Sequence, residues 1–125
     1  MLNARASITL PAPADKVWAI VTDYAGYARF PGITAAQVRK TGRDHPAGVG
    51  AVREVTAGPS SFVEEIVEFE PSRRLAYKII ESRPIKIDHE LGWMQLTARG
   101  DHTEVEWVTR GKVALPLLGT LLEVP

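Results

Sequence analysis

The sequence contains no cysteine, which excludes disulfide frameworks, thiolate zinc sites, iron–sulfur clusters and cysteine nucleophiles. It also lacks an excess of either charge, because 15 basic residues balance 15 acidic ones. Without a net charge there is no long-range field to attract a polyanion, so we do not expect nucleic acid as a partner. No apolar run reaches the roughly 18 residues that cross a bilayer. The N-terminus lacks the pattern of a signal peptide, so we expect a cytoplasmic protein without integral membrane association.

The remaining composition is typical of a folded globular protein. The 125 residues are 45% hydrophobic and 24% charged, as in ordinary soluble domains. A chain of this length buries about two-thirds of the surface that its unfolded form exposes, so we expect one domain over residues 1–125. Its three histidines lie far apart and form no metal-binding motif. We therefore expect neither a metal site nor a bound cofactor.

The first third of the chain predicts one strand and two short helices. Residues 4–10 alternate apolar and polar side chains, as in a strand with one buried face. Pro13 suits the first helical position, and apolar residues then recur at helical spacing until about Asp23. Residues 24–32 combine aromatic residues with glycine and proline, which indicates a second short helix closed by a turn.

The rest of the chain predicts an antiparallel meander of six strands, because runs rich in β-branched and aromatic residues alternate with turn signals. The predicted strands cover 33–41, 49–56, 61–70, 74–81, 86–98 and 103–113. Leucines at helical spacing over 115–122 predict a C-terminal helix that is truncated after about two turns. Such a helix is too short to cover the apolar face of so large a sheet, so a longer helix or a second subunit must supply cover.

Several segments carry a family resemblance, and they extend over nearly the whole chain. They are PAPADKVW at 11–18, VTDY at 21–24, FPG at 30–32, VEFEPSRRLAY at 67–77 and TEVEW at 103–107. With the order of elements, they resemble the SRPBCC superfamily, also called START-like or helix-grip proteins, and its polyketide cyclase/dehydrase-like branch. The resemblance implies an α+β helix-grip fold, in which a curved antiparallel sheet of about seven strands (order β-α-α-β6-α) grips a C-terminal helix. It also implies a largely apolar cavity, which in relatives holds lipids, sterols, polyketides or hydrophobic cofactors.

The turn at residues 99–102 predicts which side chains face this cavity. Pairing Ala98 with Thr103 places Leu96 opposite Val105, Met94 opposite Trp107 and Gly92 opposite Thr109. The predicted ligand-binding side chains on these two strands are Glu90, Met94, Leu96, Val105, Trp107 and Thr109. A one-residue slip, or a bulge at Gly92, would instead turn inward His89, Leu91 and Trp93.

Three further side chains have candidate roles. Tyr77 lies on the more apolar face of its strand, so we expect it inside, where it either fills the interior or stacks on a planar ligand. Inside an apolar cavity the pKa of Glu90 would rise, and the carboxyl could then act as an acid or a base. A solvated pair with Asp88 is the simpler interpretation of Glu90. Arg53 could anchor a ligand carboxylate or phosphate, although a surface ion pair is its simpler role.

The leading hypothesis is that the chain binds a hydrophobic small molecule, such as a lipid, polyketide or quinone, between the sheet and the C-terminal helix. An alternative is an enzyme of the polyketide cyclase/dehydratase type, in which Glu90 moves protons while Tyr77 or Arg53 stabilises an oxyanion. A second alternative is a protein-interaction module. If Leu91 and Trp93 point outward, they form an exposed apolar patch that a homodimer would cover.

Overall fold

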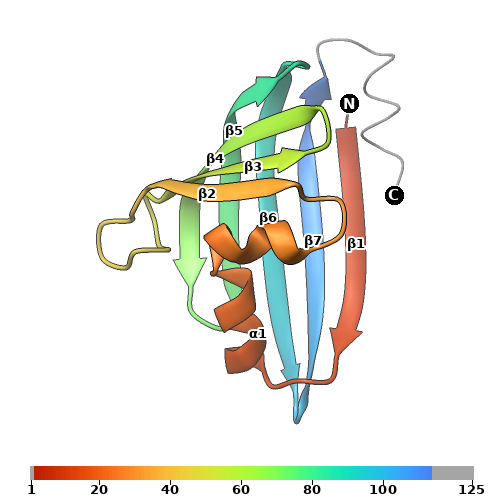
Figure 1. Ribbon diagram of the computed structural model, residues 1–125. Helices are drawn as coiled ribbons and strands as arrows, with labels where there is room; N and C mark the ends of the chain where they lie inside the picture. Colours follow the sequence, from red (N-terminus) through yellow and green to blue (C-terminus); the bar gives the residue numbers. More distant parts are fainter. Residues whose placement is uncertain (1, 114–125) are drawn as a thin grey trace.

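The computed structural model describes residues 2–113 and shows a curved antiparallel sheet with two helical segments on one face (Figure 1). The sheet has seven strands in the order β1-β7-β6-β5-β4-β3-β2. The strands are β1 (Leu2–Leu10), β2 (Ala35–Lys40), β3 (Val52–Ala57), β4 (Ser60–Glu70), β5 (Arg74–Arg83), β6 (Ile87–Arg99) and β7 (His102–Val113). The predicted α+β class and the predicted strands are confirmed. The predicted helix over 115–122 lies outside the described residues.

The two helical segments follow β1 directly. They are α1 (Ala14–Val21) and a 3-10 helix, η1 (Tyr24–Arg29). Pro13 is the extended N-cap of α1 rather than its first residue, and Thr22 ends the helix with a hydrogen bond from its Oγ1 to the carbonyl oxygen of Trp18 at 2.8 Å. Helix α1 packs against β6 and β7, whereas η1 packs against β2 and β3. No helix in the described part of the chain is long and apolar enough to span a bilayer.

The predicted register between β6 and β7 is confirmed up to a bulge at Glu90. Gly92 faces Thr109 as expected, but the register shifts between His89 and Leu91, so that His89 pairs with Gly111. The extra residue reverses the alternation of side chains. His89 is therefore buried and Glu90 exposed. The prediction that Glu90 lies on the concave face is wrong, because strict alternation does not continue through the bulge.

The core lies between the concave face of the sheet and the two helical segments. Its largest side chains are Trp18, Tyr24, Tyr27, Ile66, Leu75, Tyr77 and Leu96. The helical segments do not cover the whole face. Along β1 and β7, the side chains of Ile8 and Trp107 are 58% and 44% exposed. Within residues 2–113, the concave face is thus a packed core on one side and an open apolar surface on the other.

Candidate functional site

A buried ion pair lies on the helix-covered side of the concave face. Arg53 of β3 and Glu64 of β4 are directly opposite each other in the sheet. The Nε of Arg53 donates to a carboxylate oxygen of Glu64 at 2.8 Å, and the two residues are only 3% and 8% exposed. Because two charges removed from water are costly, such a pair persists only where further partners satisfy its polar atoms.

Three tyrosines surround the guanidinium of Arg53, and one of them also accepts a hydrogen bond from it. The guanidinium carbon of Arg53 lies 4.8 Å from the ring centre of Tyr24, 5.4 Å from that of Tyr27 and 4.9 Å from that of Tyr77. These distances allow cation–π attraction. Nη1 of Arg53 also donates to the Tyr27 hydroxyl at 3.3 Å. We call Arg53, Glu64, Tyr24 and Tyr27 the arginine cluster.

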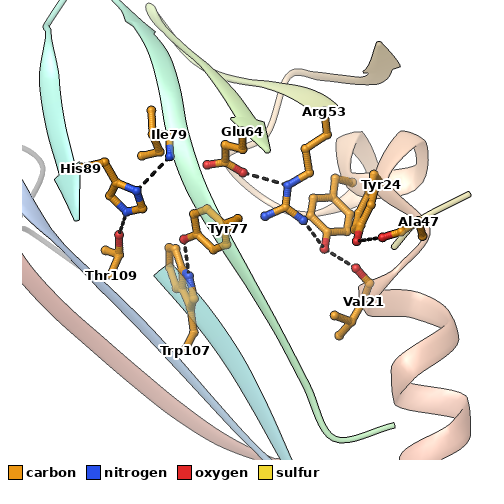
Figure 2. Close-up of polar contacts among 11 residues, drawn as sticks. Val21, Tyr24, Ala47, Arg53, Glu64, Tyr77, Ile79, His89, Trp107 and Thr109 are labelled. Carbon is orange, nitrogen blue, oxygen red and sulfur yellow. Dashed lines mark hydrogen bonds and ion pairs between the residues drawn. The ribbon is translucent and has the colours of Figure 1, made fainter. Parts of the chain in front are cut away.

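Two backbone carbonyl groups, one at the end of α1 and one in the loop between β2 and β3, hold the arginine cluster in place. The hydroxyl of Tyr27 donates to the carbonyl oxygen of Val21 at the end of α1, and that of Tyr24 donates to the carbonyl oxygen of Ala47 at 2.7 Å. Figure 2 shows the contacts of Arg53 with Glu64 and of Tyr24 with Ala47. Burial by itself lowers the pKa of Arg53, but Glu64 and the tyrosines outweigh it, so the pKa is raised. Arg53 is therefore a permanent cation.

A second, neutral cluster lies beside the first and consists of Tyr77, His89, Trp107 and Thr109, which we call the histidine cluster. The indole Nε1 of Trp107 donates to the Tyr77 hydroxyl oxygen at 2.7 Å. The ring of His89 stacks on that of Tyr77, with centres 5.5 Å apart and planes 15° apart. Figure 2 shows Tyr77 at the side of the histidine cluster that faces Arg53.

The hydrogen bonds of His89 fix its protonation. Its Nδ1 accepts from the backbone N–H of Ile79 at 2.9 Å, and its Nε2 lies 2.7 Å from Oγ1 of Thr109. Because Nδ1 is an acceptor, the ring proton is on Nε2 and is donated to Thr109. Burial, reinforced by the positive charge of Lys78, lowers the pKa of His89 to about 4. The histidine is consequently neutral at pH 7.

Tyr77 is positioned by the residue beneath it. A Cβ on Gly92 would lie 2.3 Å from Cζ of Tyr77, so the close approach of the ring to β6 requires glycine. Burial, followed by the charge of Glu64, raises the pKa of Tyr77. The neutral hydroxyl accepts from Trp107 and retains its own proton, which it can donate to another oxygen.

The structure brings only some of the predicted site residues together. Arg53, Tyr77 and Trp107 form a continuous row of contacts, and Thr109 joins it through His89. Leu96 and Val105 belong to the core, against which Met94 packs. Glu90 is exposed and lies outside both clusters. The simpler interpretation of Arg53 as a surface ion pair is wrong, because its pair with Glu64 is buried.

Sequence reasoning missed three residues of the site, namely Tyr24, Tyr27 and Glu64, and it placed His89 inside only in the alternative of a register slip or a bulge at Gly92. One of them could have been found. The turn at Gly58 pairs Ala57 with Ser60, and counting back along both strands places Glu64 opposite Arg53. The two tyrosines of η1 carry no comparable signal, because their positions depend on how η1 packs on the sheet.

The convex face differs from the prediction at Trp93. The residue points outward as expected, but the guanidinium carbons of Arg74 and Arg110 lie 5.1 Å and 5.2 Å from the centre of its ring and cover it.

A depression of about 470 Å³ also lies towards this face, with a mostly polar lining that includes Ser7, Thr9, Gln95 and Glu104. It does not contact either cluster. The concave clusters therefore remain the better candidate for a site.

Comparisons with known proteins agree with this architecture. Residues 1–123 match a family described as polyketide cyclase/dehydrase and lipid transport. A START superfamily protein from Mycobacterium smegmatis is 14% identical, with a TM-score of 0.79 over 98% of this chain and 87% of that one. The Zhui aromatase/cyclase from a Streptomyces strain is 21% identical, with a TM-score of 0.75 over 90% and 68% of the two chains. A Thermobifida fusca protein is 30% identical, with a TM-score of 0.72 over 98% and 81%. The search of curated proteins found no match.

Proposed function

The chain belongs to the polyketide cyclase/dehydrase and lipid transport family, and from this premise we propose that it binds a neutral, hydrophobic small molecule against the open side of its concave face. The observation that carries the proposal is the position of Tyr77. Its hydroxyl is buried among aromatic rings and held by Trp107, which is itself 44% exposed. A polar anchor thus lies beside an apolar surface that is still available.

The apolar part of the surface supports a ligand with rings or chains. Trp107 and Ile8 offer exposed apolar area, and burying such area contributes about 25 cal/mol per Å². An indole face also stacks well on a planar ring. A lipid, polyketide or quinone fits this chemistry, as do the general properties of concave, apolar ligand sites.

The polar part of the surface supports a neutral ligand with an oxygen acceptor. The proton of Tyr77 can be donated to a carbonyl or hydroxyl oxygen. The charge of Arg53 is already balanced by Glu64 at 2.8 Å. An anionic ligand would therefore add an unbalanced charge to this face, which is costly in a region of low dielectric.

Native mass spectrometry of gently purified protein, followed by titration with fatty acids, sterols, quinones and aromatic polyketides, tests the proposal. We expect a neutral class, the sterols, the quinones or the aromatic polyketides, to bind and to quench tryptophan fluorescence, and the ionised fatty acids to bind more weakly. The variant Trp107→Phe should lose most of that quenching and bind more weakly. The matched control Trp93→Phe alters the convex face and should leave binding unchanged. If no ligand co-purifies and no member of the panel binds, the proposal is wrong.

A second candidate function is an enzyme of the polyketide cyclase/dehydratase type. One observation favours it: the guanidinium of the permanent cation Arg53 lies 4.9 Å from the centre of the Tyr77 ring, so a cation and a phenol are neighbours, as in sites that stabilise a developing oxyanion. Glu90 is exposed, so its part in this alternative needs a direct test. In an assay of linear polyketide substrates, Tyr77→Phe should lower kcat by about 100-fold, whereas Glu90→Gln should leave turnover unchanged. Turnover that persists in Tyr77→Phe would exclude this assignment.

A further inference from the structure

The two edges of the sheet differ in how they are protected against pairing with a further strand. Strand β2 forms one edge and β1 forms the other (Figure 1). In β2 the register shifts between Val38 and Lys40, Arg39 and Lys40 are charged, and η1 packs against the strand. Bulges, charged side chains and a covering element are the usual means by which a sheet edge avoids further pairing. The edge at β2 therefore has all three.

The edge at β1 is much less protected within residues 2–113. All nine residues of β1 pair with β7 in continuous register, and the other side of the strand pairs with no described strand. The strand contains no proline, and its only charged residue is Arg5, whose Nη1 lies 3.5 Å from a carboxylate oxygen of Glu106. Residues 5–9 are all exposed. A long, regular and nearly uncharged edge of this kind is a template for another strand.

The apolar surface assigned to the ligand reaches this free edge. Ala6 of β1 lies opposite Trp107 of β7, and Ile8 lies opposite Val105. The side chains of Ile8 and Trp107 are 58% and 44% exposed. Because the described sheet ends at β1, the apolar surface ends there as well, and a strand added at this edge would extend it.

The sequence of β1 is self-complementary when two copies run antiparallel. About a two-fold axis at Ala6, perpendicular to the sheet, each Ala4 faces Ile8 of the partner subunit and each Arg5 faces Ser7 of the partner subunit. This register pairs all nine residues and sets no charge against a like charge. An axis at Arg5 would set two arginines against each other, which is destabilising. An axis at Ser7 would leave the first two residues of each strand unpaired.

We propose that β1 is a dimerisation strand, through which two copies of this chain pair antiparallel about Ala6 and join their sheets into one. In this dimer the two alanines lie side by side between the exposed indole of Trp107 and that of Trp107 of the partner subunit. The two open apolar surfaces thus become one, with small side chains between two aromatic rings. The use of this joined surface by a ligand rests on the proposed function, whereas the pairing of the strands does not.

Cysteine cross-linking tests the pairing directly, because the chain has no cysteine of its own. In the variant Ala6→Cys the two thiols of a dimer lie on opposite residues, whose Cα atoms are about 4.5–5.5 Å apart in an antiparallel pair, as a disulfide requires. We expect mild oxidation to convert most of the full chain to a covalent dimer on non-reducing electrophoresis. The control Ala35→Cys places a thiol on the exposed edge strand β2 and should stay mostly monomeric. Equal cross-linking of the two variants would overturn the pairing.

Sedimentation equilibrium of the full chain tests the register. The wild type should dimerise at micromolar concentrations, because a single pair of strands forms a small and weak interface. In Ser7→Arg the introduced side chain faces Arg5 of the partner subunit, twice in each dimer, so Kd should rise about tenfold. Within one copy the same side chain lies opposite Glu106, which is favourable, so weaker association would not reflect a damaged fold. The exchange Arg5→Ser/Ser7→Arg again sets each arginine against a serine and should restore association.

Two results would overturn the proposed dimer: a wild type that stays monomeric at about 1 mM, or a Ser7→Arg variant that dimerises as well as the wild type. The joined surface is tested by titrating the ligand panel at a protein concentration at which only the wild type is dimeric. The wild type should bind its ligand more tightly than Ser7→Arg, and equal affinities would overturn the joined surface. If no member of the panel binds either protein, the proposed function fails, and cross-linking and sedimentation still decide whether β1 pairs.

Discussion

The arginine cluster and the histidine cluster lie on the same concave face and share contacts with Tyr77, but they differ in charge and in cover. Arg53 and Glu64 carry full charges and lie beneath tyrosines that are tied to the helical side. In contrast, the histidine cluster is neutral, and its Trp107 is 44% exposed. One face of a single sheet thus combines a sealed charged region with an open neutral one.

The difference shows how the two regions divide their tasks. A buried ion pair is tolerated only when its geometry is fixed and its polar atoms are satisfied, so the arginine cluster must stay closed. Rearranging neutral hydrogen-bonding groups costs less free energy than separating a buried ion pair, so such groups can lie next to an exposed surface. We infer that the arginine cluster positions Tyr77, whereas contact with the ligand occurs at the histidine cluster.

Removing one charge of the sealed region should have the largest effect. Arg53→Met leaves the carboxylate of Glu64 buried without its partner, and we expect a loss of about 3–5 kcal/mol in the free energy of unfolding. The double variant Arg53→Met/Glu64→Leu removes both charges and should recover most of this loss. Urea unfolding at pH 7 provides the measurement. A loss below about 1 kcal/mol in the single variant would show that the pair is solvated, and the contrast between the two regions would disappear.

The second-largest effect should come from acid, which protonates His89 in the histidine cluster. The folded-state pKa of His89 is about 4, below the ordinary 6.5. The stability that its neutral form contributes is fully present above pH 6.5, falls as the pH drops from 6.5 towards 4, and is gone below it. Because screening by water reduces the effect of such a shift, we expect a loss of about 1–2 kcal/mol in the free energy of unfolding. Urea midpoints at several pH values should therefore fall more steeply for the wild type than for His89→Gln. Parallel pH profiles for the two proteins would contradict the neutral, buried state of His89.

Counting residue pairs away from a hairpin turn explains which site residues the sequence predicted and which it missed. Counting from the turn at residues 99–102 gave the correct partners in β6 and β7, since a hairpin turn fixes register. The equivalent count from Gly58 would have paired Arg53 with Glu64. Site residues that face each other across a hairpin are therefore predictable. Their burial is not, because it depends on tyrosines that η1 brings from elsewhere in the chain.

Bulges mark the limit of such predictions. In β4 the register shifts between Ile66 and Glu68, so Ile66 and Phe69 both pack on the core although simple alternation places them on opposite faces. The bulge at Glu90 has the same effect in β6 and places His89 on the concave face instead of Glu90, as the alternative with a bulge at Gly92 had anticipated for that residue. Between Ile66 and Glu68 the sequence has no glycine or other local signal of a bulge, whereas in β6 Gly92 lies two residues from the observed bulge.

Filling the space beneath Tyr77 should disturb both regions at once. In Gly92→Ala, the new methyl group would overlap the Tyr77 ring at 2.3 Å. We expect a loss of about 1–3 kcal/mol and a change in tryptophan emission as Tyr77 moves away from Trp107. The variant Tyr77→Leu lacks the clashing ring atom, so Gly92→Ala should cost less in that background. If the effects of the two substitutions on the free energy of unfolding are additive, the Tyr77 ring does not contact Gly92 of β6.

The smallest expected effect comes from the hydrogen bond between Trp107 and Tyr77, and it tests whether the two clusters differ in rigidity. A double-mutant cycle with Trp107→Phe and Tyr77→Phe should give a coupling energy of about 1 kcal/mol, the usual value for a neutral hydrogen bond. The corresponding cycle for Arg53 and Glu64 should give several times more, because each single variant there leaves a buried charge unpaired. Urea unfolding measures both cycles under the same conditions. A coupling between Trp107 and Tyr77 as large as that of the ion pair would mean that the histidine cluster is as rigid as the arginine cluster, and the two regions would then not differ in the way described.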